Sequence, residues 1–317
     1  MTKGNFIISL DFELHWGVAD LWRIEDRIDY FTATRKSIPH VLALFKQFGI
    51  HATWATVGFL FAKNKEQLLE FCPTLRPTYH DKILSYYNLI DNNEVGSDEN
   101  EDPFHYAPSL IQKIIETPGQ ELATHTFAHY YCNEIGQTLE QFEADIKAAQ
   151  AISNENFGIE LKSLVFPRNQ FNSDYLGVAN RNGIKVVRSN PDVWFWKSNS
   201  KFIPIARAFD TLLPISGSLT YKTPKVQLGE VLNLPASRFL RPYTEKEKAI
   251  QGIKVSRIKS EMTHAAKRGN SYHLWWHPHN FGYSMEKNHE MLIEVLRHYY
   301  DLNQQYGFES KSMIEMY

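Results

Sequence analysis

The chain has 317 residues, of which 43% are hydrophobic, and a formal net charge of −2. A chain so close to neutral has no overall attraction for nucleic acid or anionic lipid, and we find no basic stripe, nucleic-acid reader motif or glycine-rich phosphate loop. No apolar run is long enough to span a membrane, and two cysteines are too few for a disulfide scaffold. These features exclude several classes of protein and favour a small, weakly charged substrate.

The first five residues lead directly into an apolar stretch and lack the basic and apolar regions of a signal peptide. Together with the low cysteine content, this pattern predicts a soluble, cytoplasmic protein. The sequence leaves the oligomeric state open.

The apolar stretch 6–10 is typical of a strand buried on both faces, and two acids, Asp11 and Glu13, follow it. Successive side chains of a strand alternate between faces, so Asp11 and Glu13 point to the same side. Burying each carboxylate costs several kcal/mol unless it is paired or binds a metal. Because α/β folds place their sites at the carboxyl ends of strands, we expect a polar pocket here.

Strands and helices alternate along the rest of the chain, which is typical of a parallel sheet with right-handed crossovers. We expect further strands at 51–58, 121–124, 162–166, 184–188, 231–234 and 272–277. We expect helices at 31–48, from 59 to about 71, and at 108–116, 138–154, 173–181, 244–268 and 286–305. About seven strands in this order favour an imperfect (β/α) barrel over an open sheet, formed as a single domain over residues 1–317.

Residues 72–108 interrupt this alternation with a long, irregular insertion. Connections of this length inside a compact domain are usually functional loops or mobile segments. The acidic tract at 91–102 favours a solvated surface excursion. The alternative is a lid or a subunit contact built from the tyrosines of the segment, which are Tyr79, Tyr86, Tyr87 and Tyr106.

A second group of polar residues, His125 to His129, follows the strand at 121–124. If the chain is helical there, the two histidines share one face and can grip one ion. Two imidazoles with one carboxylate form the ligand set of a catalytic zinc or a similar divalent metal. The alternative is a pair of capping or core histidines. Cys132, three residues further on, is expected to be a buried small residue rather than a ligand.

Two later strand ends also carry ionisable residues. Arg168 follows the strand at 162–166 and can hold a carboxylate in its ionised form, unless it is a solvated or salt-bridged surface residue. The last strand delivers His277 and His279, and either imidazole can return a proton to a leaving group or merely cap the loop.

These residues resemble, in their order along the chain, the motifs of the polysaccharide deacetylases with a NodB-like domain, the fourth family of carbohydrate esterases. Residues 9–13 are similar to the first motif, 52–58 to the second strand, 125–129 to the HxxxH motif and 274–277 to the last motif. The resemblance implies a distorted (β/α)7 barrel of the α/β class with a long insertion at about 72–108.

The resemblance also implies roles for individual residues. Glu13, His125 and His129 would bind a divalent metal, most often Zn²⁺, with Co²⁺, Ni²⁺, Mn²⁺ and Fe²⁺ as alternatives. Asp11 would be the general base and His277 the general acid.

Two further motifs match the family only in part. Arg168 would orient the general base, although here Pro167 precedes the arginine, whereas prolines follow it in the family pattern. Asp192 and Trp194 are a loose counterpart of the fourth motif.

The function implied is metal-dependent removal of the N-acetyl group from an intracellular amino sugar or glycan intermediate made for surface polysaccharide. One alternative is hydrolysis of another amide, such as a formamide or a cyclic amide, on the same fold. A second is a non-catalytic carbohydrate-binding protein. Neither nucleic acid nor a membrane is expected as a partner.

Overall fold

The computed structural model describes residues 3–191, 217–227 and 229–317. Asp192 and Trp194, the expected counterpart of the fourth motif, lie outside the described residues. The strands of one sheet follow the chain as β1 (Asn5–Phe12), β2 (Ala52–Thr56), β3 (Gln120–Thr124), β4 (Ser163–Val165), β5 (Val186–Ser189), β6 (Leu232–Pro235), β7 (Arg238–Phe239), β8 (Ser271–Trp276) and β9 (Glu309–Lys311). Their order is β6-β5-β4-β3-β2-β1-β8-β7, with β9 beside β1, and all pairings are parallel.

The sheet closes into a barrel because one segment, residues 232–239, pairs with the strands at both edges of the sheet, β5 and β8. Its first part, β6, pairs with β5, and its second part, β7, pairs with β8. Between them, the Ala236 N–H donates to the Ser189 carbonyl and the Ser237 N–H donates to the His273 carbonyl. Counting β6 and β7 as one strand, and leaving out β9, which pairs with β1 outside this ring, gives seven strands around the barrel in the described residues. The structure thus confirms the expected distorted (β/α)7 barrel.

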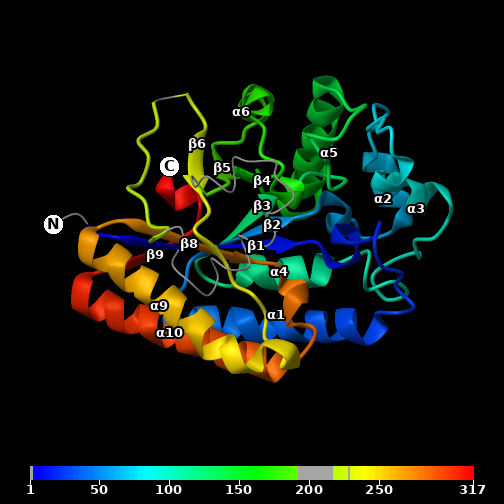
Figure 1. Cartoon of the computed structure of the whole chain (residues 1–317). Helices are drawn as coiled ribbons and strands as arrows, with labels where there is room; N and C mark the ends of the chain where they lie inside the picture. Colours follow the sequence, from blue (N-terminus) through cyan, green and yellow to red (C-terminus); the bar gives the residue numbers. More distant parts are fainter. Residues whose placement is uncertain (1–2, 192–216, 228) are drawn as a thin grey trace.

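Helices surround this barrel (Figure 1), and their described bounds are α1 (Ile28–Phe48), α2 (Lys65–Phe71), α3 (Tyr87–Asp91), α4 (Pro108–Glu116), α5 (Leu139–Phe157), α6 (Leu176–Arg181), α9 (Gln251–Arg268) and α10 (Met285–Tyr306). Helices α1, α9 and α10 lie side by side beneath the strands, with α5 and α6 above them. The expected helix 59–71 is split, because the Asn64 side chain caps a new helix by accepting from the Gln67 N–H. The expected helices at 173–181 and 244–268 both begin as 3-10 turns.

Alternation along β1 separates the core from the barrel interior. Phe6, Ile8, Leu10 and Phe12 belong to the large apolar core shared with the helices. Ile7 belongs to a smaller apolar cluster with residues of β2, β4, β5 and β6, and with Met313 near the C-terminus. The odd-numbered side chains of β1 therefore face the interior, as the period of two predicts.

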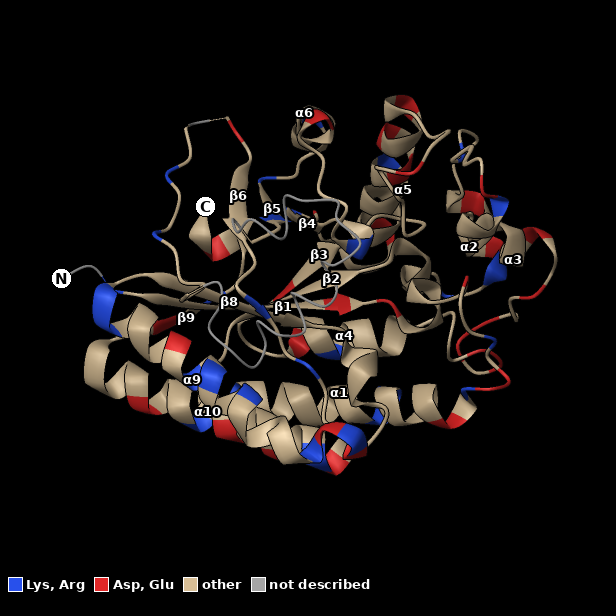
Figure 2. Cartoon of the chain, in the orientation of Figure 1, with Lys and Arg blue, Asp and Glu red and all other residues tan. Residues whose placement is uncertain are grey.

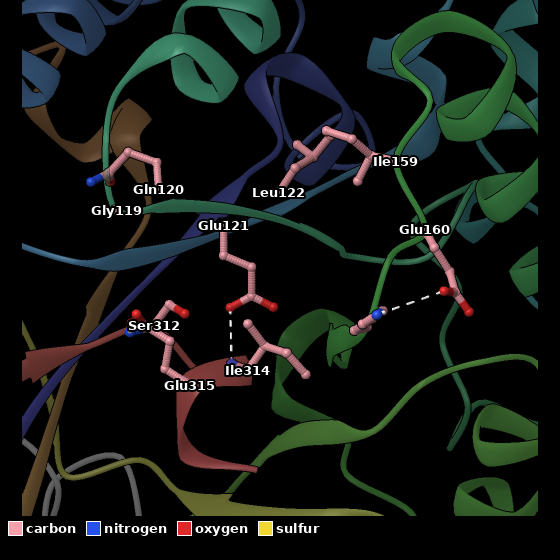
Figure 3. Close-up of a pocket in the computed structure, with 10 residues that line it drawn as sticks. Gly119, Gln120, Glu121, Leu122, Ile159, Glu160, Ser312, Ile314 and Glu315 are labelled. Carbon is pink, nitrogen blue, oxygen red and sulfur yellow. Dashed lines mark hydrogen bonds and ion pairs between the residues drawn. The ribbon is translucent and has the colours of Figure 1, made fainter.

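The amino ends of the strands are closed by the C-terminal residues (Figure 3). The Glu121 carboxylate, at the start of β3, accepts from the Ile314 N–H at 3.1 Å and from the Thr53 hydroxyl at 2.6 Å. A hollow of about 350 Å³ lies beside these residues. It lies at the opposite end of the strands from Asp11 and Glu13. In barrel folds this amino-terminal end contributes to stability, and the active site lies at the other end.

The insertion lies beyond the end of β1 that points away from the N-terminus (Figure 1). Residues 91–94 are exposed, as expected of a solvated acidic tract, but Glu99 and Asp102 further along the tract are partly buried and pair with Arg35 and His105. The tyrosines of the insertion are buried, with Tyr79, Tyr86, Tyr87 and Tyr106 each no more than 2% exposed. They pack against the barrel and are not displayed as a contact surface.

Charges of both signs are interspersed along the outer helices α9 and α10 (Figure 2). None of the helices in the described part of the chain combines the length and the hydropathy that a bilayer span requires.

Candidate metal centre

Asp11 and Glu13 enter the barrel from the carboxyl end of β1, and both are almost completely buried, with exposures of 2% and 3%. Ser9 precedes them on the same inward-facing side. The strand thus places a hydroxyl and two carboxylates in a row, which is the polar pocket that the sequence predicts.

Glu13 lies between the two histidines of the HxxxH motif. Its Oε1 atom is 2.9 Å from His125 Nε2 and 3.2 Å from His129 Nε2. Ligand atoms of these three residues all lie within 4.8 Å of one another, close enough to share a metal ion. The structure therefore brings together the three residues that were expected to be ligands.

The protonation pattern of His125 fits a cation at this position. Its Nδ1 atom is 2.8 Å from the Val165 carbonyl, which can only accept, so Nδ1 carries a proton and donates it. In the neutral imidazole, Nε2 then presents a lone pair to the Glu13 carboxylate. Two lone-pair donors facing each other in a buried site require a positive charge between them or a proton, and a bound divalent cation would supply such a charge.

The local structure of the motif differs from the expectation. Residues 125–129 form a loop and not a helix, because Thr126 and His129 have positive φ angles of 65° and 54°. A buried acid on α5, Asp145, stabilises this loop by accepting from the N–H groups of Phe127 at 2.7 Å and Ala128 at 3.0 Å. Burial raises the pKa of Asp145 to about 7. The histidines converge through loop geometry and not through helical spacing.

The charges of the centre are mutually compensating. Burial alone would raise the pKa of Glu13, but His277, His125 and His129 hold it well below its usual range. Burial lowers the pKa of His129. An ionised carboxylate beside a neutral imidazole is the protonation state in which both groups can bind a metal.

Asp11 is held by an arginine, but not by the expected one. Arg188, on β5, donates from Nη1 to Asp11 Oδ1 at 2.6 Å and from Nη2 to Asp11 Oδ2 at 2.7 Å. Burial raises the pKa of Asp11, yet the paired Arg188 guanidinium more than offsets this effect and lowers it. Arg168 instead donates to Asp20 and lies over the Tyr131 ring. The reason is local: Arg168 has a positive φ of 52° on the loop after β4, which turns it toward Asp20.

Arg188 is itself positioned by residues that the sequence analysis did not select. Its Nη1 donates to Ser9 Oγ at 3.0 Å, and Ser9 Oγ is 2.8 Å from His273 Nε2 on β8. Trp275 lies under the guanidinium at 4.4 Å. The sequence does contain a feature that could have identified them. Arg188 and His273 lie inside apolar strands at inward-facing positions, where an unpaired charge is too costly to retain.

His277 and His279 both reach the centre from the end of β8, but they differ in access. His277 Nε2 lies 3.7 Å from both Asp11 Oδ2 and Glu13 Oε1, and its side chain is 24% exposed. His279 is only 5% exposed, with its Nδ1 atom 3.8 Å from Glu13 Oε2. Burial and the neighbouring His277 lower the pKa of His279 to about 3. A substrate can therefore reach His277 more readily than His279.

Cys132 is buried, and its thiol is directed at the Gln170 carbonyl. It belongs to neither of the two groupings of candidate metal ligands in the described residues, which are Glu13 with the two HxxxH histidines, and Asp11 with Glu13 and His277. The structure places it as the buried small residue that the sequence predicts.

Solved structures share this architecture at low sequence identity. A candidate polysaccharide deacetylase from Mycobacterium smegmatis is 12% identical, with a TM-score of 0.61 over 99% of this chain and 90% of that chain. A second, from Pseudomonas aeruginosa PAO1, is 10% identical, with a TM-score of 0.57 over 98% and 88%. The Puue allantoinase is 11% identical, with a TM-score of 0.54 over 98% and 87%. No curated protein sequence matches the chain.

The closed parallel barrel, with acids at the end of its first strand and a histidine pair after its third, places the protein in the NodB-like class of α/β barrels. The model of the polysaccharide deacetylase family matches residues 27–187, just over half of the chain. The protein belongs to this family, and membership supports a deacetylase function.

The loop that carries the histidines should depend on Asp145. Replacing Asp145 with Ala leaves two buried N–H groups without an acceptor, which should lower the free energy of unfolding by roughly 2–4 kcal/mol. Urea unfolding measures this loss. Lys147→Gln is the matched control on the same helix: it removes only an exposed ion pair with Glu143 and should cost less than about 0.5 kcal/mol. Equal stability of the two variants would contradict the role assigned to Asp145.

Proposed function

We propose that the protein removes the N-acetyl group from an amino sugar or a glycan intermediate in a reaction that requires a divalent metal, with zinc as the first candidate. The observation that carries this proposal is the convergence of a metal-ligand set, a paired acid and an accessible imidazole on one point. Polar atoms of Asp11, Glu13 and His277 lie within 4.8 Å of one another there.

The ligand set would be Glu13, His125 and His129. Once bound, the metal would supply a positive charge that polarises the amide carbonyl and lowers the pKa of a water molecule. The chain's own groups would fix where this chemistry occurs, because burial of all three side chains excludes bulk solvent from their side of the centre.

Asp11 is suited to accept the proton of the attacking water. Both carboxylate oxygens are held by Arg188, which keeps the group ionised and fixes its orientation. The lowered pKa makes Asp11 a weaker base than a free carboxylate. A carboxylate held in position beside a water molecule of lowered pKa can nevertheless accept its proton.

His277 is suited to give a proton to the departing nitrogen. An amine leaves poorly as an anion, so amide hydrolysis needs such a donor. The Nδ1 atom of His277 is 3.3 Å from Asn280 Oδ1, which orients the ring, while its Nε2 faces the two carboxylates. The ring is bordered by Phe239 and Trp275, with centroids 5.8 Å away in each case. Trp275 is buried against Arg188, whereas Phe239 is half-buried and its aromatic ring suits contact with a sugar.

A substrate panel tests the proposal. Purified protein loaded with zinc should release acetate from at least one N-acetylated sugar or oligosaccharide, and chelation should abolish the release. Asp11→Asn should keep zinc but lose nearly all turnover, because an amide cannot take the proton. Release of formate, or opening of a cyclic amide without acetate, would select the alternative amide hydrolase; binding of sugars without any hydrolysis would select a carbohydrate-binding protein.

The two arginines give a second test. Arg188→Lys replaces a two-pronged contact with a single ammonium and should lower kcat by roughly 10–100-fold at saturating metal, because the base loses its orientation. Arg168→Lys keeps the charge beside Asp20 and should lower kcat far less. Steady-state kinetics on the same substrate compare them. A larger loss in the Arg168 variant would restore the role that the sequence suggested for it.

A further inference from the structure

A continuous relay of hydrogen bonds runs from His129, away from the metal centre, to Tyr86 of the insertion and on to Asp20. His129 Nδ1 lies 3.0 Å from the Tyr131 hydroxyl, which lies 2.8 Å from the Tyr86 hydroxyl. Tyr86 donates to Asp20 Oδ1 at 2.9 Å. Tyr86 is contributed by the insertion, and Asp20 by the loop that follows β1.

The direction of each bond follows from counting protons. Tyr86 donates to Asp20, and its single hydroxyl proton is used in that bond. Tyr131 must then give its own proton to the Tyr86 oxygen. Its oxygen is left to accept from His129, which places a proton on Nδ1 and a lone pair on Nε2.

We propose that Asp20 and Tyr86 are positioning residues for the metal centre: acting through Tyr131, they fix the tautomer and the ring orientation of His129 so that its Nε2 lone pair faces Glu13. This inference rests on the proposed metal site and adds to it a distant carboxylate that determines metal affinity.

The residues of this relay are buried and are held by further contacts. Tyr86, Tyr131 and His129 are each no more than 2% exposed, so water cannot replace their hydrogen bonds. The Tyr86 ring also stacks on the His129 ring, with centroids 5.6 Å apart and an interplanar angle of 13°. The second oxygen of Asp20 accepts from Arg168, whose guanidinium lies 4.4 Å over the Tyr131 ring.

This network gives the insertion and Arg168 defined roles. The insertion supplies Tyr86, and also Tyr79, whose hydroxyl accepts from the Tyr131 N–H at 2.8 Å and so fixes the backbone beside the relay. Arg168 balances the charge of Asp20, which stays an acceptor. The same tautomer of His125 is set by a backbone carbonyl, whereas that of His129 depends on residues far along the chain.

Tyr86→Phe removes one oxygen and breaks the relay. The Tyr131 proton, having lost its acceptor, can then turn toward His129 Nδ1 and place the imidazole proton on Nε2, where it competes with a metal. Loss of such outer partners typically weakens metal binding by about 10–100-fold. Tyr87→Phe is the matched control: Tyr87 is the next residue, equally buried, and its hydroxyl has no hydrogen-bond partner within the described residues.

The experiment measures zinc affinity of the full chain by competition with a chelator, and the tautomer of His129 by long-range ¹H–¹⁵N spectra of the metal-free protein. We expect at least a tenfold weaker affinity and a changed His129 tautomer in Tyr86→Phe, and wild-type behaviour within twofold in Tyr87→Phe. In Asp20→Asn, Arg168 can pair only with the amide oxygen, so the amide NH2 faces Tyr86 and donates where the carboxylate accepted. This variant should therefore reproduce the Tyr86→Phe result and replaces it if that variant does not fold.

Two results would overturn the inference in distinguishable ways. Wild-type affinity and tautomer in both Tyr86→Phe and Asp20→Asn would remove the relay and leave the proposed function intact. Failure of the wild-type chain to bind zinc or another divalent metal would remove the metal centre, and with it both proposals.

Discussion

The structure depends on the burial of two carboxylates at the end of one central strand. Asp11 and Glu13 are almost inaccessible to water, and neither could remain ionised there without compensation. The Arg188 guanidinium compensates the charge of Asp11. The two histidines, together with a cation that they could bind, would compensate the charge of Glu13. Many of the other polar residues inside the barrel hold Arg188 and the histidines in position.

This support is arranged in layers along the strands. At the amino ends, apolar residues including Met313 lie beside the Glu121 carboxylate, which accepts from Thr53 and from the Ile314 N–H. In the middle, Ser9 and His273 link β1 and β8 beneath Arg188. At the carboxyl ends, the acids and imidazoles meet a region open enough to expose part of His277. The insertion closes one flank of this region with buried tyrosines, so it is part of the wall of the centre.

The parts of this arrangement that follow from local periodicity could be predicted from the sequence. The period of two in β1 correctly placed Asp11 and Glu13 on one side, and the order of strands and helices correctly favoured a seven-stranded barrel. The two histidines of the HxxxH motif do converge on Glu13, but not for the reason expected, because positive φ angles at Thr126 and His129 make a loop where a helix was expected.

Contacts that depend on long-range packing could not be predicted in this way. Arg188 reaches Asp11 from β5, which is separated from β1 by β2, β3 and β4 in the sheet order, so Arg188 was not selected and Arg168 was. The link from Tyr86 to His129 joins an insertion to a loop some forty residues away, and no spacing rule connects them.

The most direct test is a crystal structure of the protein with zinc, with data collected on both sides of the zinc absorption edge. The account predicts one anomalous peak within about 2.0–2.2 Å of a Glu13 oxygen and of the Nε2 atoms of His125 and His129. Absence of a peak at full zinc loading, or a peak held by other residues while these three remain in direct contact, would contradict it.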